Sequence, residues 1–505
     1  MSGPIIFDQT TKSETKRISI DPITRLEGHG KIEIFLDDNG NVSNAYWQVP
    51  ELRGFERFCI GRLAEDMNKI TSRLCGVCPG AHHLCSTKAL DQVYGADPPE
   101  TAKKLRELFY SAHYVHSHIA HFYALAAPDF VLGPSSPAAN RNILGVVGAV
   151  GVEVGGEVIK HRSYAQKIQE MLGGKATHPV CGLPGGMSKP LGEDERKKVE
   201  EWAKSCVEFS KFTMKILEDV VLKNKDYMNI ITSKDIFYNE TYHLGTVDKN
   251  GLVNFYDGTQ VMIDLNGKEV ARYTGKEYLK WIAEHTEPWS YEKFCYFKPV
   301  GWKGFRTGMD SGIYRATPMS RLNVAKGFTT PLAQKYYEQY KGAFRDLGVK
   351  GPIQHTQAMH WARVIELMYA SEKLLELAQD PEITDTHIRA EKLQTPGEGV
   401  GILEAPRGTL VHHYVSDENG IIKDVNLVVG TTNNNAPINV SVQTAAKALI
   451  KNWQVSPGLL NIIEMAYRAY DPCNSCATHT LPGQSPLVVN IRKADGTVFQ
   501  TLRNY

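Results

Sequence analysis

Two pairs of cysteines at opposite ends of the sequence constrain its fold more than any other feature. Cys75 and Cys78 stand in "RLCGVCPGAHH", and Cys473 and Cys476 stand in "DPCNSCATH", so 395 positions separate Cys78 from Cys473. Two thiols spaced by three residues can hold one ion from a turn or a helix start, and four thiolates can close a tetrahedral site. If all four serve one site, the fold must bring both ends of the chain together.

The spacing alone leaves three interpretations open. The four cysteines hold a structural zinc ion, or they hold a cluster or a catalytic metal, or they are buried thiols that only pack. Zinc ribbons place their pairs about 15 to 20 residues apart in a small module whose metal replaces a core. A chain of 505 residues is long enough to bury a sizeable core without such a metal.

Composition excludes several classes of partner. Lys and Arg number 57 against 56 Asp and Glu, and a formal charge of +1 provides no field that would gather nucleic acid or acidic lipid. No apolar run approaches 18 residues, and the run Ile5–Phe7 is too short for a signal-peptide core. We therefore expect a cytoplasmic protein without direct membrane insertion. Nine cysteines, an odd number, favour reduced thiols that are available as ligands.

Strand patterns occur in three parts of the sequence. Residues 17–48 alternate apolar and polar residues around a turn at "DDNG", which predicts a hairpin or a small sheet. Residues 236–300 are aromatic and rich in turns, which predicts a β-containing insertion. After Gly399, "GILEAPRGTLVHHYVSDENGIIKDVNLVVG" predicts one long hairpin that turns at "DENG".

Three long segments have the apolar spacing of helices wide enough to pack in a bundle: 99–127, 193–221 and 357–379. The first begins with Pro99 and a charged turn, as helices often do. The predicted fold class is α+β, mainly α, with a central bundle of long helices, small sheets or hairpins near both ends, and the β-containing insertion.

The residues around the cysteines resemble the large subunit of nickel-iron hydrogenases. The family motif RxCGxCxxxH is present as Arg73, Cys75, Gly76, Cys78 and His82, and DPCxxCxxH as Asp471, Pro472, Cys473, Cys476 and His479. Further matching segments follow in the family's order: "DPITRLEGHGKI" at 21–32, "RGFE" at 53–56, "HFYALAAPDF" at 121–130, "HPVCGLPGG" at 178–186 and "EAPRG" at 404–408. The resemblance therefore covers nearly the whole chain.

The resemblance implies a cofactor of one Ni and one Fe that share the four thiolates, with one CO and two cyanides on the Fe. By position, Cys75 and Cys473 would be terminal Ni ligands, and Cys78 and Cys476 would bridge the two metals. Soft sulfur ligands suit a nickel ion that changes oxidation state.

The resemblance also implies roles in moving protons. Cys473 is expected to accept the first proton from H2, and Glu27 to pass it onward. Arg407 matches the arginine that overhangs the open coordination position, where a guanidinium stays charged. Asp129 and Asp471 match the carboxylates that hold this arginine in place. From the residues alone, Glu27 also fits a solvated strand and the two aspartates fit structural ion pairs.

Further candidates surround the expected cofactor. Pro406 and Arg407 lie in "EAPRG", and Thr431 falls where many relatives have Pro-Ser, so its hydroxyl is expected to donate to a cyanide. His82 is expected to donate a hydrogen bond to a bridging thiolate. A separate Mg or Fe ion would take its ligands from the following set: Glu56, His479 and a backbone carbonyl around Leu427.

Four histidines in the first long helix also look like metal ligands at first sight: His113, His116, His118 and His121. Their spacing fits one helical face only in part, and such aromatic residues more often line the core of a bundle. We therefore expect them to be core residues.

Electrons need an exit that this sequence does not provide. It has no C-x2-C-x2-C run for a ferredoxin-type cluster and no Gly-rich dinucleotide fingerprint after a strand. The resemblance implies a small subunit that carries iron-sulfur clusters, together with further cytoplasmic electron-transfer subunits. It favours the type linked to heterodisulfide reductase, with the NAD-linked type next.

The resemblance divides the chain into a catalytic domain, residues 1–479, and a C-terminal extension, residues 480–505. In this family a maturation endopeptidase removes such an extension after the histidine. The alternative to an enzyme is a non-catalytic scaffold, either stapled by zinc or similar to the quinone-module subunit of complex I. That complex I relative lacks the two CxxC pairs, and both are intact here.

Overall fold

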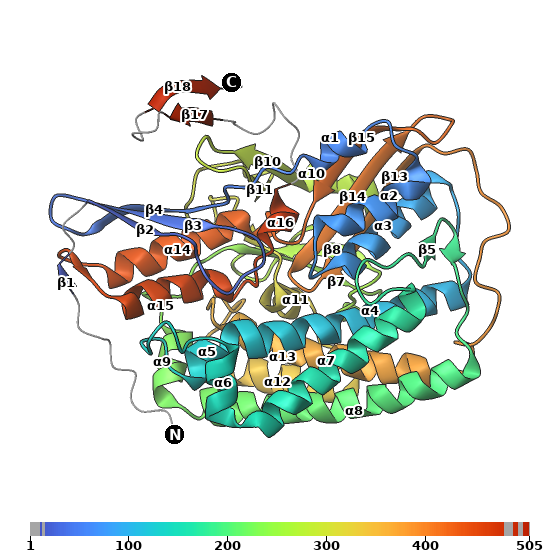
Figure 1. Ribbon diagram of the computed structural model, residues 1–505, viewed down its shortest axis with the longest axis horizontal. Coiled ribbons are helices and arrows are strands. Elements are labelled where there is room, and N and C mark those ends of the chain that lie inside the picture. The colour runs from blue at the N-terminus through green and yellow to red at the C-terminus, as the bar shows by residue number, and fades with distance from the viewer. Residues whose placement is uncertain (1–10, 13–15, 479–487, 493–497, 504–505) are drawn as a thin grey trace.

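Long helices fill one half of the molecule in the computed structural model, which describes residues 11–12, 16–478, 488–492 and 498–503 (Figure 1). The main helices are α4 (Glu100–Ala120), α7 (Val152–Gly173), α8 (Glu193–Leu217), α12 (Pro331–Asp346) and α13 (Ala358–Ala378). Helix α13 packs against α4, α8 and α12, and α4 also packs against α7. Because α13 is buried along most of its length, it forms the centre of the bundle.

All three predicted helices are confirmed, and two of them end differently from the prediction. Helix α4 continues as a π-helical segment, η3 (His121–Ala126), and then as α5 (Ala127–Val131). Helix α8 is likewise followed by a π-helical segment, η4 (Glu218–Leu222). Each π segment inserts an extra residue per turn and so changes the face that the following turn presents.

The predicted sheet near the N-terminus is confirmed as three antiparallel strands. They are β2 (Arg17–Ile20), β3 (Lys31–Leu36) and β4 (Val42–Gln48), in spatial order β2-β3-β4. Ile32 of β3 stands opposite Ile20 and Trp47, and Trp47 is fully buried. This alternation directs one face of the sheet toward helix α14 (Asn435–Leu449), which packs against β4.

The predicted β-containing insertion is also confirmed. Its strands are β7 (Tyr242–Val247), β8 (Thr259–Ile263), β9 (Glu269–Tyr273), β10 (Ile282–Thr286) and β11 (Lys293–Phe297). Strands β7, β8 and β9 form an antiparallel sheet to which β12 (Tyr314–Arg315) adds in parallel beside β7. Strands β10 and β11 form a separate hairpin.

The prediction of one long hairpin after Gly399 is wrong in one respect, because the segment forms three strands. They are β13 (Glu398–Ala405), β14 (Gly408–Ser416) and β15 (Ile422–Val428). The second turn lies at "DENG" as predicted, but an earlier turn occurs at Pro406 and Arg407. Gly408 closes this tight turn with φ of 157°, where a Cβ atom would lie 2.4 Å from the Ala316 carbonyl oxygen. The first turn therefore presents Arg407 at the end of a two-stranded ribbon.

Helix α3 (Pro79–Val93) covers β13 and β14, and α15 (Pro457–Arg468) packs on α14. The remaining helical segments are α1 (Phe55–Cys59), η1 (Ala64–Asp66), α2 (Met67–Thr71), η2 (Ser72–Leu74), α6 (Ile143–Val150), α9 (Lys225–Thr232), η5 (Gly275–Glu277), α10 (Tyr278–Trp281), α11 (Pro318–Val324), η6 (Thr432–Asn434) and α16 (Asn474–Ala477). The remaining strands pair as β1 (Thr11–Lys12) with β16 (Gln454–Val455), β5 (Gly182–Leu183) with β6 (Gly186–Met187), and β17 (Val488–Arg492) with β18 (Val498–Arg503).

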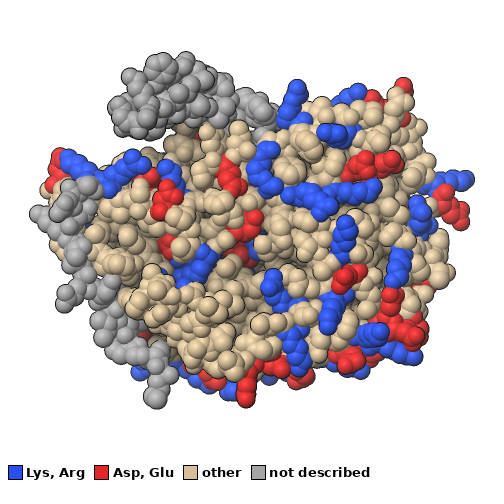
Figure 2. All heavy atoms as spheres, viewed as in Figure 1, with Lys and Arg blue, Asp and Glu red and all other residues tan. Residues whose placement is uncertain are grey.

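Within the described residues, no helix combines the length and apolar character that a bilayer crossing needs. Figure 2 shows positive and negative side chains interspersed over much of one face of the molecule, in keeping with the formal charge of +1.

Candidate metal centre

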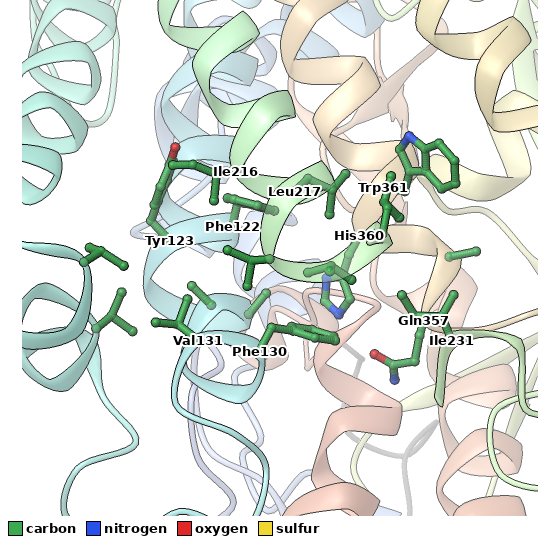
Figure 3. Close-up of a pocket in the computed structure, with 18 of the residues that line it drawn as sticks. Phe122, Tyr123, Phe130, Val131, Ile216, Leu217, Ile231, Gln357, His360 and Trp361 are labelled. Atoms are coloured by element: carbon green, nitrogen blue, oxygen red, sulfur yellow. The ribbon is translucent and has the colours of Figure 1, made fainter. Parts of the chain in front are cut away.

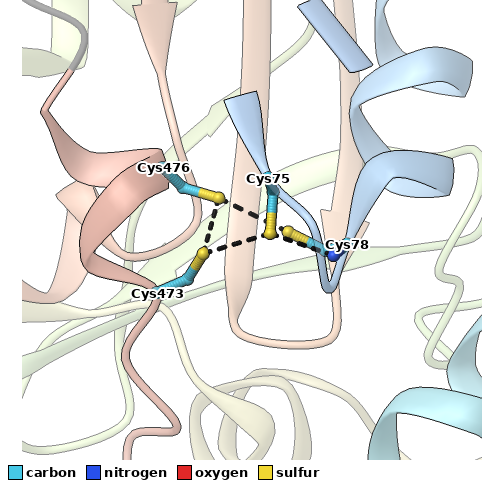
Figure 4. Close-up of side chains that lie close together, drawn as sticks. All are labelled: Cys75, Cys78, Cys473 and Cys476. Atoms are coloured by element: carbon cyan, nitrogen blue, oxygen red, sulfur yellow. Dashed lines mark hydrogen bonds between the residues drawn. The ribbon is translucent and has the colours of Figure 1, made fainter. Parts of the chain in front are cut away.

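The thiols of both cysteine pairs meet at one point between α3 and α16 (Figure 4). The Sγ atoms of Cys75 and Cys473 are 3.2 Å apart, and those of Cys78 and Cys476 are 3.5 Å apart. All four sulfur atoms lie within 4.8 Å of one another, and all four side chains are buried. The central expectation from the sequence, that the two ends supply one site, is confirmed.

The first pair is held by a turn between two helical segments. Cys75 follows η2, and Cys78 precedes α3, whose first residue is Pro79. The Sγ atom of Cys75 accepts hydrogen bonds from the backbone N–H groups of Val77 at 3.2 Å and Cys78 at 3.0 Å. Backbone donors favour a thiolate, so this turn is prepared for a metal ligand.

The second pair lies against the loop that contains Glu27. Asp471, with φ of 56°, reverses the chain after α15, and α16 begins directly after Cys473. The backbone N–H of Asn474 donates to the carbonyl of Glu27 at 2.9 Å. A Cβ atom on Gly28, where φ is 83°, would lie 2.8 Å from the backbone nitrogen of Ser475. Glycine at this position therefore allows the two segments to touch.

Burial and the neighbouring sulfur atoms shift the pKa values of these thiols. Burial raises the pKa values of Cys473 and Cys476 well above the ordinary value; the neighbouring thiols add to this shift at Cys473, whereas at Cys476 the hydrogen bond with Cys473 opposes it. Burial acts in the same direction on Cys75, but hydrogen bonds from Cys473 and the other cysteines outweigh it and lower the pKa of Cys75. A bound cation would favour the thiolate at all four positions.

Glu27 lies within hydrogen-bond reach of a candidate ligand. The Cys473 thiol donates to Glu27 Oε2 at 2.9 Å, and the backbone N–H of Ser475 donates to the same oxygen at 3.1 Å. Burial, together with the negative charge of Cys75, raises the pKa of the Glu27 carboxyl. A carboxyl group of this kind can exchange a proton with the thiol nearer neutral pH than an exposed glutamate.

Arg407 and Asp471 form a buried ion pair beside the thiols. Arg407 Nη2 is 3.2 Å from Asp471 Oδ1, and Nη1 is 3.4 Å from the hydroxyl of Ser117. The thiols and Asp471 together keep the pKa of Arg407 well above its ordinary value despite burial. Burial raises the pKa of Asp471, and Arg407 opposes that shift.

Asp129 does not hold Arg407, so that expectation from the sequence is wrong. Its carboxylate pairs with Arg25 at 2.5 Å and with Arg468 at 3.1 Å, and it accepts a hydrogen bond from Asn461. Asp129 lies in α5, directly after the π-helical segment, and its carboxylate faces Arg468 of α15 and the loop of Arg25. Asp129 thus fixes the loop that carries Glu27.

A second buried arginine fixes the turn of Arg407. All five N–H donors of Arg321 are used: three bonds reach the carboxylates of Glu366 and Glu404 at 2.6 to 3.0 Å, and two reach the carbonyl oxygens of Ala405 and Pro406 at 3.1 and 3.2 Å. The side chains of Arg321, Glu366 and Glu404 are all fully buried. Arg321 could not be predicted from the sequence, because its partners lie 45 to 85 positions away.

Three other residues expected around the cofactor lie close to the thiols: Thr431, His82 and Pro406. The hydroxyl oxygen of Thr431 accepts the backbone N–H of Cys473 at 3.0 Å, which leaves the hydroxyl hydrogen available to donate. His82 Nε2 is 3.4 Å from the Sγ atom of Cys476. Arg407, Thr431 and His82 line a small cavity together with Cys78, Cys473 and Cys476. Pro406 supplies the turn beside it.

Glu56 and Leu427, two of the residues expected at the second ion, are in contact with each other. The backbone N–H of Leu427 donates to Glu56 Oε1 at 2.9 Å, and the ammonium group of Lys293 lies 3.5 Å from Glu56 Oε2. Lys293 is a neighbour that the sequence analysis did not identify. His479, the other expected ligand of this ion, lies outside the described residues.

The histidines of the first long helix contact different partners. His113 bonds Gln169, His118 lies 3.0 Å from Glu366, and His121 lies 2.9 Å from the Arg468 carbonyl. Burial lowers the pKa values of His113, His116, His118 and His121. Buried neutral imidazoles with separate partners are what a bundle core contains.

A separate cavity lies where η3, η4 and α13 meet (Figure 3). Carbon atoms dominate its lining, as in Phe122, Phe130 and Leu217, and Gln357 and His360 are among its few polar residues. None of the nine cysteines lines it. It therefore offers no donor set for a metal ion, unlike the cavity beside Cys473 and Cys476.

The donor set of the thiol cluster fits soft transition metals. Four buried sulfur atoms within 4.8 Å match sites for nickel, iron or zinc and do not match the oxygen-rich sites of Mg or Ca. The half-buried Glu27 touches this cluster and the buried Arg407 lies beside it, which a purely structural zinc site does not need.

Comparisons with known proteins match both sequence and fold. A family model described as "Nickel-dependent hydrogenase" matches residues 53–140 and 157–479, and one described as "HoxL-like" matches residues 17–52. The chain is 51% identical to an iron-sulfur subunit of the F420-non-reducing hydrogenase of Archaeoglobus profundus, over 97% of this chain and 100% of that protein. It is 35% identical to NAD-reducing hydrogenase HoxS subunit beta of Cupriavidus necator, over 95% of this chain and 98% of that protein.

The fold is similar to one chain of a solved NAD+-reducing [NiFe]-hydrogenase in the H2-reduced state. The TM-score is 0.85 at 36% sequence identity, with 92% of this chain and 100% of that chain covered. Sequence and structure therefore agree over nearly the whole length.

Proposed function

The chain belongs to the nickel-dependent hydrogenase family as a catalytic subunit, and we propose how its residues move protons and electrons during the reversible cleavage of H2. The observation that carries the proposal is the contact between the Cys473 thiol and Glu27 inside a cluster of four buried sulfur atoms. The zinc-stapled and complex-I-like scaffolds are not favoured, because neither explains a half-buried glutamate and a buried arginine at this cluster.

The four thiolates hold the metals in this proposal. Cys75, Cys78, Cys473 and Cys476 would together hold nickel and iron. The bound metals supply the polarisation and the redox chemistry that hydrogen cleavage needs. One CO and two cyanides on the iron complete the proposed cofactor. Thr431 would donate its free hydroxyl hydrogen to a cyanide, and Pro406 shapes the adjoining wall.

Proton movement begins at Cys473. When H2 is cleaved, the bound metals would keep both electrons of its bond, the Cys473 sulfur accepts a proton, and Glu27 Oε2, at 2.9 Å, takes that proton onward. The raised pKa of Glu27 suits this task, since an ordinary glutamate would give up the proton too readily to return it. Arg407 would stabilise negative charge that develops beside the thiols, and Asp471 fixes its guanidinium at 3.2 Å.

A second ion, Mg or Fe, is proposed at Glu56, His479 and a backbone carbonyl around Leu427. The support is one buried carboxylate at the correct place in the sequence beside the Leu427 backbone. Lys293 lies 3.5 Å from the same carboxylate, so the ion would also have to tolerate a neighbouring ammonium group.

We propose that an iron-sulfur small subunit covers helices α6 and α7. A pocket lined by Glu27, Val77 and Arg407 reaches these helices. Leu144, Val152 and Ile159 are 71 to 79% exposed there, and Figure 2 shows few charged side chains over α6. An exposed apolar face beside a redox centre fits a protein that receives electrons. Ile159→Asp should reduce co-purification of that partner, whereas Leu347→Asp, also at an exposed site, should not.

The remaining parts of the proposal rest on sequence. Residues 480–505 are an extension that a maturation endopeptidase removes after His479, leaving residues 1–479 as the catalytic domain with its β-containing insertion at 236–300. The greater identity to the F420-non-reducing relative, 51% against 35%, supports that type over the NAD-reducing type. Further electron-transfer subunits and a cytoplasmic location belong to the same proposal.

Metal analysis and infrared spectroscopy test this function. Protein produced with its maturation system and partner subunits should contain nickel and iron in equal amounts, show CO and cyanide bands, and reduce a viologen dye with H2. Cys473→Ser should lose the nickel and the dye reduction. Zinc alone in the active preparation, or a Cys473→Ser variant with wild-type nickel content, contradicts the proposal.

A further inference from the structure

A chain of buried hydrogen bonds leads from Cys476 into the protein between α3 and β14. His82 Nε2 faces the Cys476 sulfur at 3.4 Å, and His82 Nδ1 is 3.1 Å from His412 Nε2. His412 Nδ1 is 2.5 Å from the hydroxyl oxygen of Tyr414, and that hydroxyl donates to Ser86 Oγ at 2.8 Å. All these side chains are at most 1% exposed.

The two elements supply matching pairs of side chains. His82 and Ser86 are four residues apart on α3, so they share one face of the helix about 6 Å apart. His412 and Tyr414 are two residues apart on β14, so they share one face of the strand about 7 Å apart. Because the two spacings are similar, His82 contacts His412 and Ser86 contacts Tyr414. The hydrogen-bond network depends on all four side chains.

The hydroxyl hydrogen of Tyr414 decides how the other hydrogens are arranged. Tyr414 donates its single hydrogen to Ser86, so its oxygen must accept from Nδ1–H of His412. A neutral His412 then offers the lone pair of Nε2, which accepts from Nδ1–H of His82. This network of hydrogen bonds therefore holds a hydrogen on Nδ1 of His82 and fixes the orientation of its ring, so a neutral His82 presents the lone pair of Nε2 to Cys476 at 3.4 Å and does not donate to a thiolate there.

We propose that His412 and Tyr414 are positioning residues for the metal centre and act on it through His82. This inference rests on the proposed function, in which Cys476 would be one of the metal ligands. A side chain that faces a ligand sulfur influences a metal centre, and the partner behind an imidazole fixes its tautomer and its orientation. Burial raises the pKa of Tyr414 well above its ordinary value, so the hydroxyl keeps its hydrogen.

Infrared spectra of the assembled enzyme test the inference. Tyr414→Phe removes the hydroxyl and lets His412 and His82 reorient, so the CO and cyanide bands should remain present but shift from their wild-type positions. Tyr340→Phe is the matched control: Tyr340 is fully buried, and its hydroxyl has no hydrogen-bond partner in the described part of the chain. The control should give wild-type band positions.

A second variant covers the case in which Tyr414→Phe fails to fold. Ser86→Ala keeps the phenol ring and removes only the acceptor of its hydrogen, so the bands should shift again, by less. Wild-type band positions in a folded Tyr414→Phe enzyme, or in Ser86→Ala when Tyr414→Phe does not fold, overturn the positioning role. A wild-type enzyme without CO and cyanide bands overturns the proposed function and this inference together, which separates the two failures.

Discussion

Replacing Arg321 by Met should destabilise the protein and loosen the turn that carries Arg407. Arg321 donates five hydrogen bonds, three to carboxylates and two to carbonyl groups of that turn. Met fills a similar volume but leaves the carboxylates of Glu366 and Glu404 buried without their cation. Removing one partner of a buried ion pair costs about 3 to 5 kcal/mol.

The magnitude can be converted into a melting temperature. An unfolding entropy of about 2.1 cal/mol/K per residue gives about 1 kcal/mol/K for a chain of this length. The variant should therefore melt about 3 to 5 °C below wild type. The assay is thermal unfolding of the metal-free chain followed by circular dichroism, with Arg272→Met as control. Arg272 pairs with Glu269 on the surface, with both side chains about half exposed, so this control should move the midpoint by about 0.5 °C or less.

The difference in melting temperature between wild type and Arg321→Met should also depend on pH. Burial raises the pKa of Glu366, but Arg321 outweighs burial and lowers it below the ordinary value. The stability that Arg321 provides is therefore present above the unfolded pKa of a glutamate and is lost as pH falls through the folded pKa. The gap between wild type and Arg321→Met should shrink as the solution is acidified. A gap at neutral pH no larger than that of Arg272→Met refutes the reasoning.

Three further variants test other parts of the structure. Glu27→Gln should keep its nickel but lower H2-dependent dye reduction about 100-fold or more, since a proton relay is removed; a near-normal rate would rule out the relay. Asp471→Asn should slow the same reaction about 10- to 100-fold, because Arg407 loses a buried charged partner; unchanged kinetics would show that Arg407 is held otherwise. Burial raises the pKa of Glu292 well above its ordinary value, so its stabilising effect is complete below the unfolded pKa and is lost as pH rises toward the folded pKa. Glu292→Gln should therefore gain in melting temperature relative to wild type as pH rises from 4 to 8, and a constant difference contradicts this.

Much of the fold could be predicted because its signals are local. The helical spacing of 99–127, 193–221 and 357–379 and the alternation of 17–48 depend only on neighbouring residues. The turn at Pro406 was missed because apolar residues continue on both sides of it and the "DENG" turn gave the stronger signal. The π-helical segments after α4 and α8 were not predicted, because the spacing of apolar residues does not distinguish a short π-helical segment from an α-helix.

The site was predictable where it depends on motifs and unpredictable where it depends on packing. The two cysteine motifs identify the ligands, and the structure brings their thiols together. Asp129 was misassigned because its partners, Arg25 and Arg468, lie 104 and 339 positions away in the sequence. The contact between His82 and His412 joins residues 330 positions apart, so no local pattern announces it.

The meeting of Cys75 with Cys473 also sets the order of events during protein synthesis. A ribosome that adds about 5 to 20 residues per second needs about 20 to 80 s to make the 398 residues between the two thiols. For that interval the emerging N-terminal thiols have no counterpart and must stay reduced without their metals. Metal insertion therefore has to wait for a nearly finished polypeptide, and any factor that delivers nickel or iron must recognise a chain that has left, or almost left, the ribosome.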